Sequence, residues 1–341
     1  MLRLGIIGAG GIASLHTHNI LSGKCPEVQL TAMADRKESR REWIRATVPD
    51  AAVFCEGSDL IASDTCDAVL IATPHYQHPT LAIEAFRHGK HVLCEKPAGV
   101  YTLQVRDMIA EADKHPELTF GMMFNQRTNC VYRKAKALID SGALGEIKRM
   151  IWVVTDWYRT QSYYDAGAWR ATWDGEGGGV LLNQMVHELD YLYYLFGQPK
   201  SVYALGGING NLGIDVEDNL DAIYRYESEQ GTFPVSVHAD FYQYPPSRFV
   251  KVVGERGHII VDLLKAEVTQ AVGDEVTVIP YPDFARNDMF IEELKLFIDC
   301  IREDTEPAIP LADGIVSLKM ALAARKSMET GGVIDEFTGT V

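Results

Sequence analysis

Short apolar segments alternate with amphipathic segments through the first third of the chain. The segment 78–89 has helical periodicity, with Pro79 suited to the first helical position and Gly89 to the C-terminal cap. Alternation of strands and helices is typical of a doubly wound parallel sheet. The predicted strands are 4–9 (LGIIGA), 28–34 (VQLTAMA), 51–55 (AAVFC), 67–73 (DAVLIAT), 91–95 (HVLCE) and 118–124 (LTFGMMF).

Beyond about residue 124 the pattern changes to longer segments in which every second residue is apolar, as in a largely antiparallel sheet. These predicted strands are 147–157, 220–228, 232–241, 248–254, 257–262 and 275–282, and helices are predicted at 130–142, 289–303 and 315–329. We therefore expect an α/β protein with a doubly wound domain at 1–123 and an α/β domain with a large, mostly antiparallel open sheet at 124–341. The last two helices are candidates for packing back on the first domain.

Composition and charge narrow the range of partners. The chain has 341 residues, 47% of them hydrophobic, and a net charge of -15, which disfavours nucleic acid and anionic membranes as partners because their phosphates would be repelled. No apolar run approaches the roughly 20 residues that span a bilayer, and the N-terminus lacks a signal-peptide pattern. The six cysteines have no metal-binding or disulfide spacing. We expect a cytoplasmic protein without a metal that acts on a small molecule.

A glycine-rich turn follows the first strand directly. Gly8 permits a tight turn, Gly10 lets the backbone approach a pyrophosphate, and Gly11 and Ile12 open the helix that follows. Asp35 ends the second strand, where its carboxylate can accept hydrogen bonds from ribose hydroxyls. This combination is the dinucleotide-binding fingerprint of a Rossmann domain and predicts NAD.

The choice between NAD and NADP depends on two neighbouring residues. Asp35 favours NAD because a 2′-phosphate would meet a carboxylate at close range. Arg36 complicates this prediction, since its guanidinium can either stack on adenine or tolerate the 2′-phosphate. We therefore predict NAD, with NADP as the alternative.

Two further strand ends carry candidate chemistry, because open α/β sheets bind ligands at the carboxyl ends of their strands. Lys96 follows the fifth strand, and a lysine in a partly desolvated cleft can exchange a proton with an alcohol. The alternative is a surface lysine in a salt bridge. The other residues that we expect near the cofactor at these strand ends are Thr73, Pro74, His78 and Glu95.

A run of three glycines at 177–179 precedes a predicted helix that carries Asn183 and His187. On one continuous helix these two side chains would share a face, so Asn183 could orient a group that His187 protonates. The alternative for His187 is a structural histidine satisfied by Asp190 one turn later. No further ligand pattern accompanies them, which argues against a metal.

Aromatic residues beside arginine precede the glycine run. Tyr163, Trp169 and Arg170 suit the apolar face and hydroxyl edge of a sugar ring, or the ribose and phosphates of a nucleotide. The alternative is ordinary core and rim packing. Gln126, after the sixth strand, is a further candidate for closing over the nicotinamide ring.

Taken together, the motifs GAGGIA, ADR, ATPHYQHP, CEKPAG, FNQR and GEGGGVLLNQMVHELD resemble, in this order and over essentially the whole chain, the Gfo/Idh/MocA family. The resemblance implies a Rossmann domain, NAD(P)-dependent oxidation of sugars or cyclitols, and an open sheet that often supports homodimers or homotetramers. It also implies that Lys96 and His187 are catalytic, that the position of Asn183 completes the site, and that Trp169 and Arg170 lie near cofactor and substrate.

One position departs from the family pattern, since many members carry aspartate where this chain has Asn183. An amide carries no charge, so we interpret Asn183 as a group that orients a substrate hydroxyl and assign the proton transfer to Lys96 and His187. The predicted function is NAD-dependent oxidation of a secondary hydroxyl of a sugar, sugar derivative or cyclitol, or the reverse reduction. Two alternatives remain: a glycosidase that retains NAD and oxidises the sugar transiently, and a non-catalytic NAD-binding regulator.

Overall fold

A computed structural model describes the chain except for residues 166, 168, 211, 230, 308 and 338–341. It forms two compact units. The first comprises Met1–Asn125 together with Asn287–Ile315, and the second comprises Gln126–Arg286 together with the chain from Val316. Within the described residues, no helix combines the length and apolar character that crossing a membrane requires.

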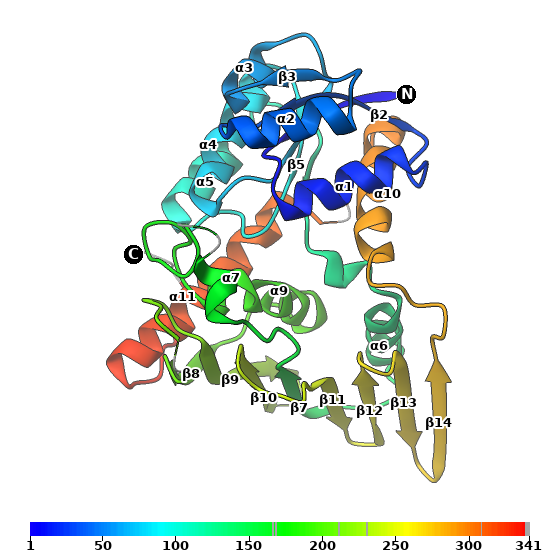
Figure 1. Cartoon of the computed structure of the whole chain (residues 1–341). Helices are drawn as coiled ribbons and strands as arrows, with labels where there is room; N and C mark the ends of the chain where they lie inside the picture. The colour runs from blue at the N-terminus through cyan, green and yellow to red at the C-terminus, as the bar shows by residue number, and fades with distance from the viewer. Residues whose placement is uncertain (166, 168, 211, 230, 308, 338–341) are drawn as a thin grey trace. The chain divides into compact units, whose positions relative to one another are not determined.

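The first unit (Figure 1) is built on a parallel sheet of six strands. Their order is β3-β2-β1-β4-β5-β6. Its strands are β1 (Leu2–Ile7), β2 (Val28–Ala34), β3 (Ala52–Phe54), β4 (Ala68–Ile71), β5 (His91–Cys94) and β6 (Phe120–Met122). Its helices are α1 (Gly11–Leu21), α2 (Glu38–Thr47), α3 (Gly57–Ala62), α4 (His78–Arg87), α5 (Thr102–Ala112) and α10 (Asp288–Glu303), with a 3-10 turn η1 (His75–Gln77). The order reverses at β1 and β4, as the predicted doubly wound Rossmann sheet requires.

The parallel strands are buried because helices cover them. All four residues of β4 are inaccessible, and Leu4 and Ile6 of β1 lie in the same apolar core as Leu30 of β2. Helix α10, which lies far from these strands in the sequence, places Leu294 and Phe297 in this core. The carboxyl ends of β1, β2, β4 and β5 are therefore held by a packed core on which loop residues can be positioned accurately.

The second unit is built on an eight-stranded sheet in the order β14-β13-β12-β11-β7-β10-β9-β8. All neighbours are antiparallel except β7 and β10, which run parallel. Its strands are β7 (Ile147–Val154), β8 (Ser201–Gly207), β9 (Asn219–Ser228), β10 (Gly231–Asp240), β11 (Arg248–Gly254), β12 (Gly257–Asp262), β13 (Glu267–Val272) and β14 (Glu275–Pro280). The predicted open, mostly antiparallel sheet is confirmed, although the hydrophobic pattern did not single out β8 and β13.

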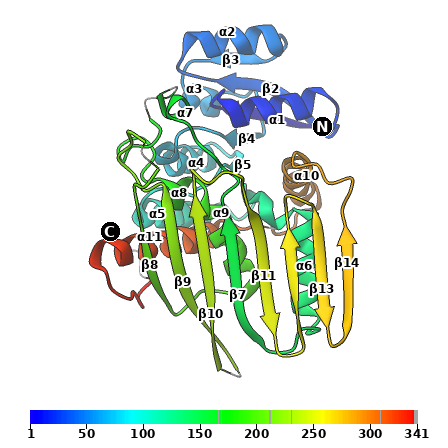
Figure 2. The same ribbon diagram turned by 60° about the horizontal axis from the view of Figure 1, so that its bottom comes forward.

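Helices cover one face of this sheet, and the other face carries none within the described part of the second unit (Figure 2). The helices are α6 (Cys130–Asp140), α7 (Gln161–Asp165), α8 (Val180–Asn183), α9 (Met185–Phe196) and α11 (Leu311–Thr330), whose first turn is assigned to the first unit, and η2 (Asn125–Arg127) precedes α6. Tyr191 of α9 stacks on Tyr132 of α6 with ring centroids 4.6 Å apart, and Trp152 of β7 meets both rings edge-on. This aromatic contact fixes α9 on the sheet.

Candidate active site

The glycines of the turn after β1 have two different structural roles. Gly8 has φ +94°, and a β-carbon there would lie 2.5 Å from the carbonyl oxygen of Ala72. At Gly10 and Gly11 a β-carbon would meet nothing within 4 Å. The backbone therefore borders open space where α1 begins, and Ile12 lies in the first turn of this helix. A helix N-terminus without a side chain above it is suited to bind a pyrophosphate, so these residues fit a dinucleotide.

Asp35 closes the same loop from the end of β2. The backbone N–H of Ala9 donates to Oδ2 of Asp35 at 2.8 Å, and the backbone N–H of Lys37 donates to Oδ1 at 2.8 Å. Arg36 is exposed, and its Nε donates to Oε2 of Glu56 at 2.8 Å. Two carboxylates, Asp35 and Glu56, thus lie in the neighbourhood where the ribose of a dinucleotide would bind, which favours NAD over NADP.

Removing the charge of Asp35 is expected to shift the cofactor preference. In Asp35→Asn the amide oxygen can still accept from Ala9, but the repulsion of a 2′-phosphate is lost. We expect the ratio of kcat/KM for NADP to that for NAD to rise about tenfold or more, while the melting temperature changes little. Steady-state kinetics with both cofactors measure this ratio. A wild-type protein that already prefers NADP would contradict the role of Asp35.

The ends of β4 and β5 are joined by a buried histidine. His78, at the start of α4, has Nδ1 2.8 Å from the carbonyl oxygen of Pro97 and Nε2 2.9 Å from that of Thr73. Burial lowers the pKa of His78, although both carbonyl groups favour the protonated ring. His78 is therefore a brace between two loops, one of which contains Pro74 and the other Lys96.

Lys96 lies half-buried where β5 ends, and its peptide bond to Pro97 is cis. On its N-terminal side, Glu95 is buried with Oε1 3.4 Å from Nε2 of His16, a residue of α1. On its C-terminal side, the carbonyl group of Pro97 is held by His78. The structure thus fixes the backbone on both sides of Lys96 and links it to the helix that follows the glycine loop.

In the second unit the glycine run leads into two helices rather than one. Helix α8 ends at Asn183 and α9 begins at Met185, with Gln184 between them. The backbone N–H of His187 donates to the carbonyl oxygen of Gln184 at 3.2 Å, which shortens the turn. The expectation of one continuous helix through Asn183 and His187 is therefore wrong. The break arises where α8 is anchored: Glu217 accepts from the backbone N–H groups of Gly179 and Leu181, each at 3.0 Å.

Glu176 is a residue that the sequence analysis missed. It is 2% exposed, its Oε2 accepts from the backbone N–H of Ala171 at 2.7 Å, and its Oε1 accepts from Nδ2 of Asn183. Ala171 has φ +53°, an uncommon conformation for a residue with a side chain. The carboxylate therefore ties the loop after Arg170 to the amide of Asn183. A lone glutamate before three glycines was the only signal available in the sequence.

The remaining predicted residues lie in the same unit. His187 is 8% exposed near the start of α9, and Gln126 is buried in η2. Asp190 of α9 accepts from Nε and Nη2 of Arg127 at 2.8 and 2.6 Å, so its carboxylate is engaged by a guanidinium group. Trp169, Arg170 and Tyr163 form a contact group in which Arg170 lies over both rings.

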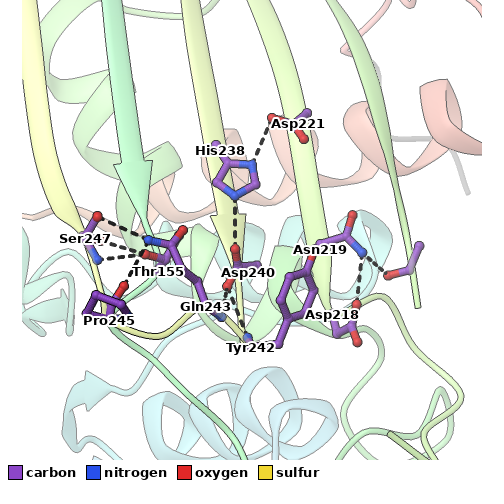
Figure 3. Close-up of polar contacts among 11 residues, drawn as sticks. Thr155, Asp218, Asn219, Asp221, His238, Asp240, Tyr242, Gln243, Pro245 and Ser247 are labelled. Atoms are coloured by element: carbon purple, nitrogen blue, oxygen red, sulfur yellow. Dashed lines mark hydrogen bonds and ion pairs between the residues drawn. The ribbon is translucent and has the colours of Figure 1, made fainter. Parts of the chain in front are cut away.

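A polar cluster at the end of β10 was not anticipated (Figure 3). Nδ1 of His238 lies 2.9 Å from Oδ1 of Asp221 on β9, and Nε2 lies 3.1 Å from Oδ2 of Asp240. Oδ1 of Asp240 in turn accepts from the backbone N–H groups of Tyr242 and Gln243. Partial burial opposes the charged ring, but the two carboxylates outweigh it and raise the pKa of His238.

This cluster predicts a pH-dependent contribution to stability. Because the pKa of His238 is raised on folding, its stabilising effect is complete below the unfolded value of about 6.5 and is lost as the pH rises through the folded value. For a pair that is partly exposed we expect about 0.2–1 kcal/mol. The melting temperature of wild type should exceed that of His238→Gln more at about pH 5.5 than at about pH 8. An equal difference at both pH values would contradict the prediction.

An open glycine loop closed by an acidic residue at the end of β2 defines the first unit as a dinucleotide-binding domain of the Rossmann type. Residues 2–122 match the model of the oxidoreductase family with an NAD-binding Rossmann fold, and residues 132–260 match the model of the GFO/IDH/MocA C-terminal domain. The chain belongs to this family of oxidoreductases, the Gfo/Idh/MocA family. The predictions of family, fold and cofactor NAD are thereby confirmed.

Similar proteins are dehydrogenases at low sequence identity. A myo-inositol 2-dehydrogenase of Thermotoga maritima is 26% identical over 96% of each chain. The structure of the WlbA dehydrogenase from Bordetella pertussis, in complex with NADH and UDP-GlcNAcA, has a TM-score of 0.83 with 27% identity over 98% of each chain. That of myo-inositol 2-dehydrogenase from Lactobacillus plantarum has a TM-score of 0.83 with 25% identity, over 98% of this chain and 99% of the other.

Proposed function

We propose that the protein is a dehydrogenase that oxidises a secondary hydroxyl group of a sugar, sugar derivative or cyclitol, or reduces the corresponding ketone. The observation that carries the proposal is the fixed position of Lys96 at the carboxyl end of β5, with the backbone braced by His78 on one side and Glu95 held by His16 on the other. Ligands of open α/β sheets bind at this end of the strands. The similarity to inositol dehydrogenases supports the same substrate class.

In this proposal the reaction divides between cofactor and protein. Bound NAD supplies the acceptor for the hydride. The neutral amine of Lys96 accepts the hydroxyl proton, so the alcohol loses a hydride and a proton and becomes a ketone. Asn183 holds a substrate hydroxyl by hydrogen bonding, and His187 assists the proton transfer. Glu176 is a positioning residue, because it acts on the substrate only through the amide of Asn183.

We also assign residues to the parts of the bound cofactor. In the first unit, Gly8, Gly10, Gly11 and Ile12 would hold the pyrophosphate, and Asp35 the ribose hydroxyls. Thr73 and Pro74 lie in the loop that His78 braces, where the nicotinamide half would extend. These roles are supported by the open space beside Gly10 and Gly11 and by the contacts of Asp35 and His78. On the family resemblance we assign Trp169 to the cofactor, and Arg170 to cofactor and substrate. Gln126 is assigned to the nicotinamide because it follows the sixth strand.

A screen for NADH formation tests the proposal. The purified protein is mixed with NAD and a panel of inositols, aldoses, sugar acids and glycosides, and the absorbance of NADH is followed. We expect steady NADH formation with at least one polyol. Release of an aglycone without net NADH would support the glycosidase instead, and NAD binding without turnover of any compound would support the regulator.

We further infer that the open face of the second sheet joins copies of this chain into a homodimer or homotetramer. Partly exposed apolar residues on this face include Ile151 of β7, Phe249 of β11 and Ile223 of β9, which is 49% exposed. They lie among polar residues such as Ser236 and Lys251, and a mixed face of this kind, without covering helices, offers a contact surface for a second copy. Light scattering should give a multiple of the chain mass, which Ile223→Lys should reduce. A monomeric wild-type protein would contradict this inference.

A further inference from the structure

Two guanidinium groups lie on the ring of Tyr163. The Cζ atom of Arg159 is 4.2 Å from the ring centroid and that of Arg170 is 4.7 Å from it. Nη1 of Arg170 also donates to the hydroxyl oxygen of Tyr163 at 2.7 Å, and its Cζ lies 4.5 Å from the ring of Trp169. All four side chains are half-buried. These ring contacts hold the two guanidinium groups in place and do not use all of their N–H donors.

Within the described residues, neither Arg159 nor Arg170 reaches a carboxylate. The chain has 47 acidic and 32 basic residues, so carboxylates are abundant. Two buried arginines of the second unit are neutralised by them: Arg127 pairs with Asp190, and Arg248 pairs with Asp156 and Glu188. Two guanidinium groups on one tyrosine therefore form a local positive region in a protein whose net charge of -15 otherwise repels anions.

This arginine pair is connected to the proposed substrate site by a short chain of contacts. Arg170 directly precedes Ala171, whose backbone N–H donates to Glu176, and Glu176 accepts from the amide of Asn183. The same carboxylate therefore fixes the loop that carries Arg170 and the side chain assigned to a substrate hydroxyl. The backbone next to Arg170 is therefore tied, through Glu176, to the residue assigned to a substrate hydroxyl.

We propose that the substrate carries a negative charge, a carboxylate or phosphate group on the sugar, and that Arg159 and Arg170 bind this group. The proposal rests on the proposed function, because it names the class of sugar that the dehydrogenase oxidises. The guanidinium fork matches the paired oxygens of a carboxylate or phosphate, and the rings of Tyr163 and Trp169 suit the apolar face of a sugar. In the proposed function the glycine loop of the first unit binds the phosphates of the cofactor.

Matched substrates test the proposal. For glucose, galactose and mannose we compare the neutral sugar, its uronic acid and its 6-phosphate, at saturating NAD, and measure initial rates. Calorimetric titration of the NAD-loaded protein with the same compounds gives binding without turnover. The variants are Arg159→Gln and Arg170→Gln. Arg256→Gln is the control, since Arg256 is an exposed arginine of the same unit in the turn between β11 and β12.

We expect at least one anionic sugar to have a kcat/KM about 10- to 100-fold above that of its neutral counterpart, because hydrogen bonds to charged groups contribute an effect of this size. Arg159→Gln should remove most of this advantage through KM, and Arg256→Gln should leave it unchanged. Preference for the uronic acid or for the phosphate identifies the anionic group.

Three outcomes would overturn the proposal: neutral and anionic sugars used equally well, a loss in Arg159→Gln that is the same for both, or a loss confined to NAD binding. If no sugar is oxidised, the proposed function is wrong, and the calorimetric titration then tests the arginine site by itself. An anionic sugar that binds to wild type and not to Arg159→Gln would support the arginine site. If no anionic sugar binds to wild type, the arginine site is rejected as well.

Discussion

Lys96→Met is expected to lower kcat by about a hundredfold or more and to leave the dissociation constant of NAD nearly unchanged. The substitution keeps the length and apolar stem of the side chain but removes the amine that accepts the hydroxyl proton. The braces around it, His78 on the carbonyl group of Pro97 and His16 on Glu95, do not involve the Lys96 amine. Stopped-flow or steady-state measurement of NADH formation gives kcat, and calorimetry gives NAD affinity.

Lys24→Met is the control for loss of a positive charge in the same unit, because Lys24 is exposed in the loop after α1. It should retain wild-type activity. If Lys96→Met turns over at the wild-type rate, Lys96 is not the proton acceptor. A large loss of NAD affinity in Lys96→Met would instead assign this residue to cofactor binding alone.

The second large effect is expected at the pair formed by Asn183 and Glu176. Asn183→Asp would place a carboxylate against Oε1 of Glu176, where the amide now donates a hydrogen bond. Two carboxylates at this distance cannot both remain ionised without repulsion, so one takes up a proton or the loop moves. We expect kcat/KM to fall about 10- to 1000-fold near neutral pH and to recover partly at lower pH, where the pair shares a proton.

Exchanging the amide and the carboxylate between positions 183 and 176 distinguishes an effect of charge repulsion from an effect of altered geometry. The double variant Glu176→Gln with Asn183→Asp again pairs one amide with one carboxylate and should recover activity to within about tenfold of wild type. Asp174→Asn is the control, since Asp174 is exposed in the same loop. A single Asn183→Asp variant with wild-type activity and pH profile, or a double variant no better than the single one, would show that Glu176 does not position Asn183.

The architecture followed from the sequence because its signals are local. Each strand of the first unit is a short apolar run between turn residues, and the glycine loop and Asp35 stand where a doubly wound sheet places them. Lys96 could be singled out in the same way, as a charged residue immediately after a buried strand. In these places propensity, periodicity and turn chemistry agree, and such agreement makes a segment predictable.

The features that escaped prediction depend on contacts between distant residues. The segment from Val180 to Asp190 has an uninterrupted helical pattern, and its break at Gln184 accompanies the anchoring of Gly179 by Glu217, a residue 38 positions away. Glu176 became recognisable only when the turn at Ala171 brought a backbone N–H to its carboxylate. Likewise, the partners of Arg159 are rings rather than carboxylates, and sequence spacing does not reveal this.

The most direct test of the central claim follows the hydride itself. A substrate identified in the NADH screen is prepared with deuterium at the carbon that bears the oxidised hydroxyl group, and the products of a single turnover with NAD are examined by mass spectrometry and NMR. We expect one deuterium on C4 of the nicotinamide ring and the corresponding ketone in equal amount, and we expect neither in Lys96→Met. A nicotinamide without deuterium, or deuterium returned to the sugar without net NADH, would contradict this expectation.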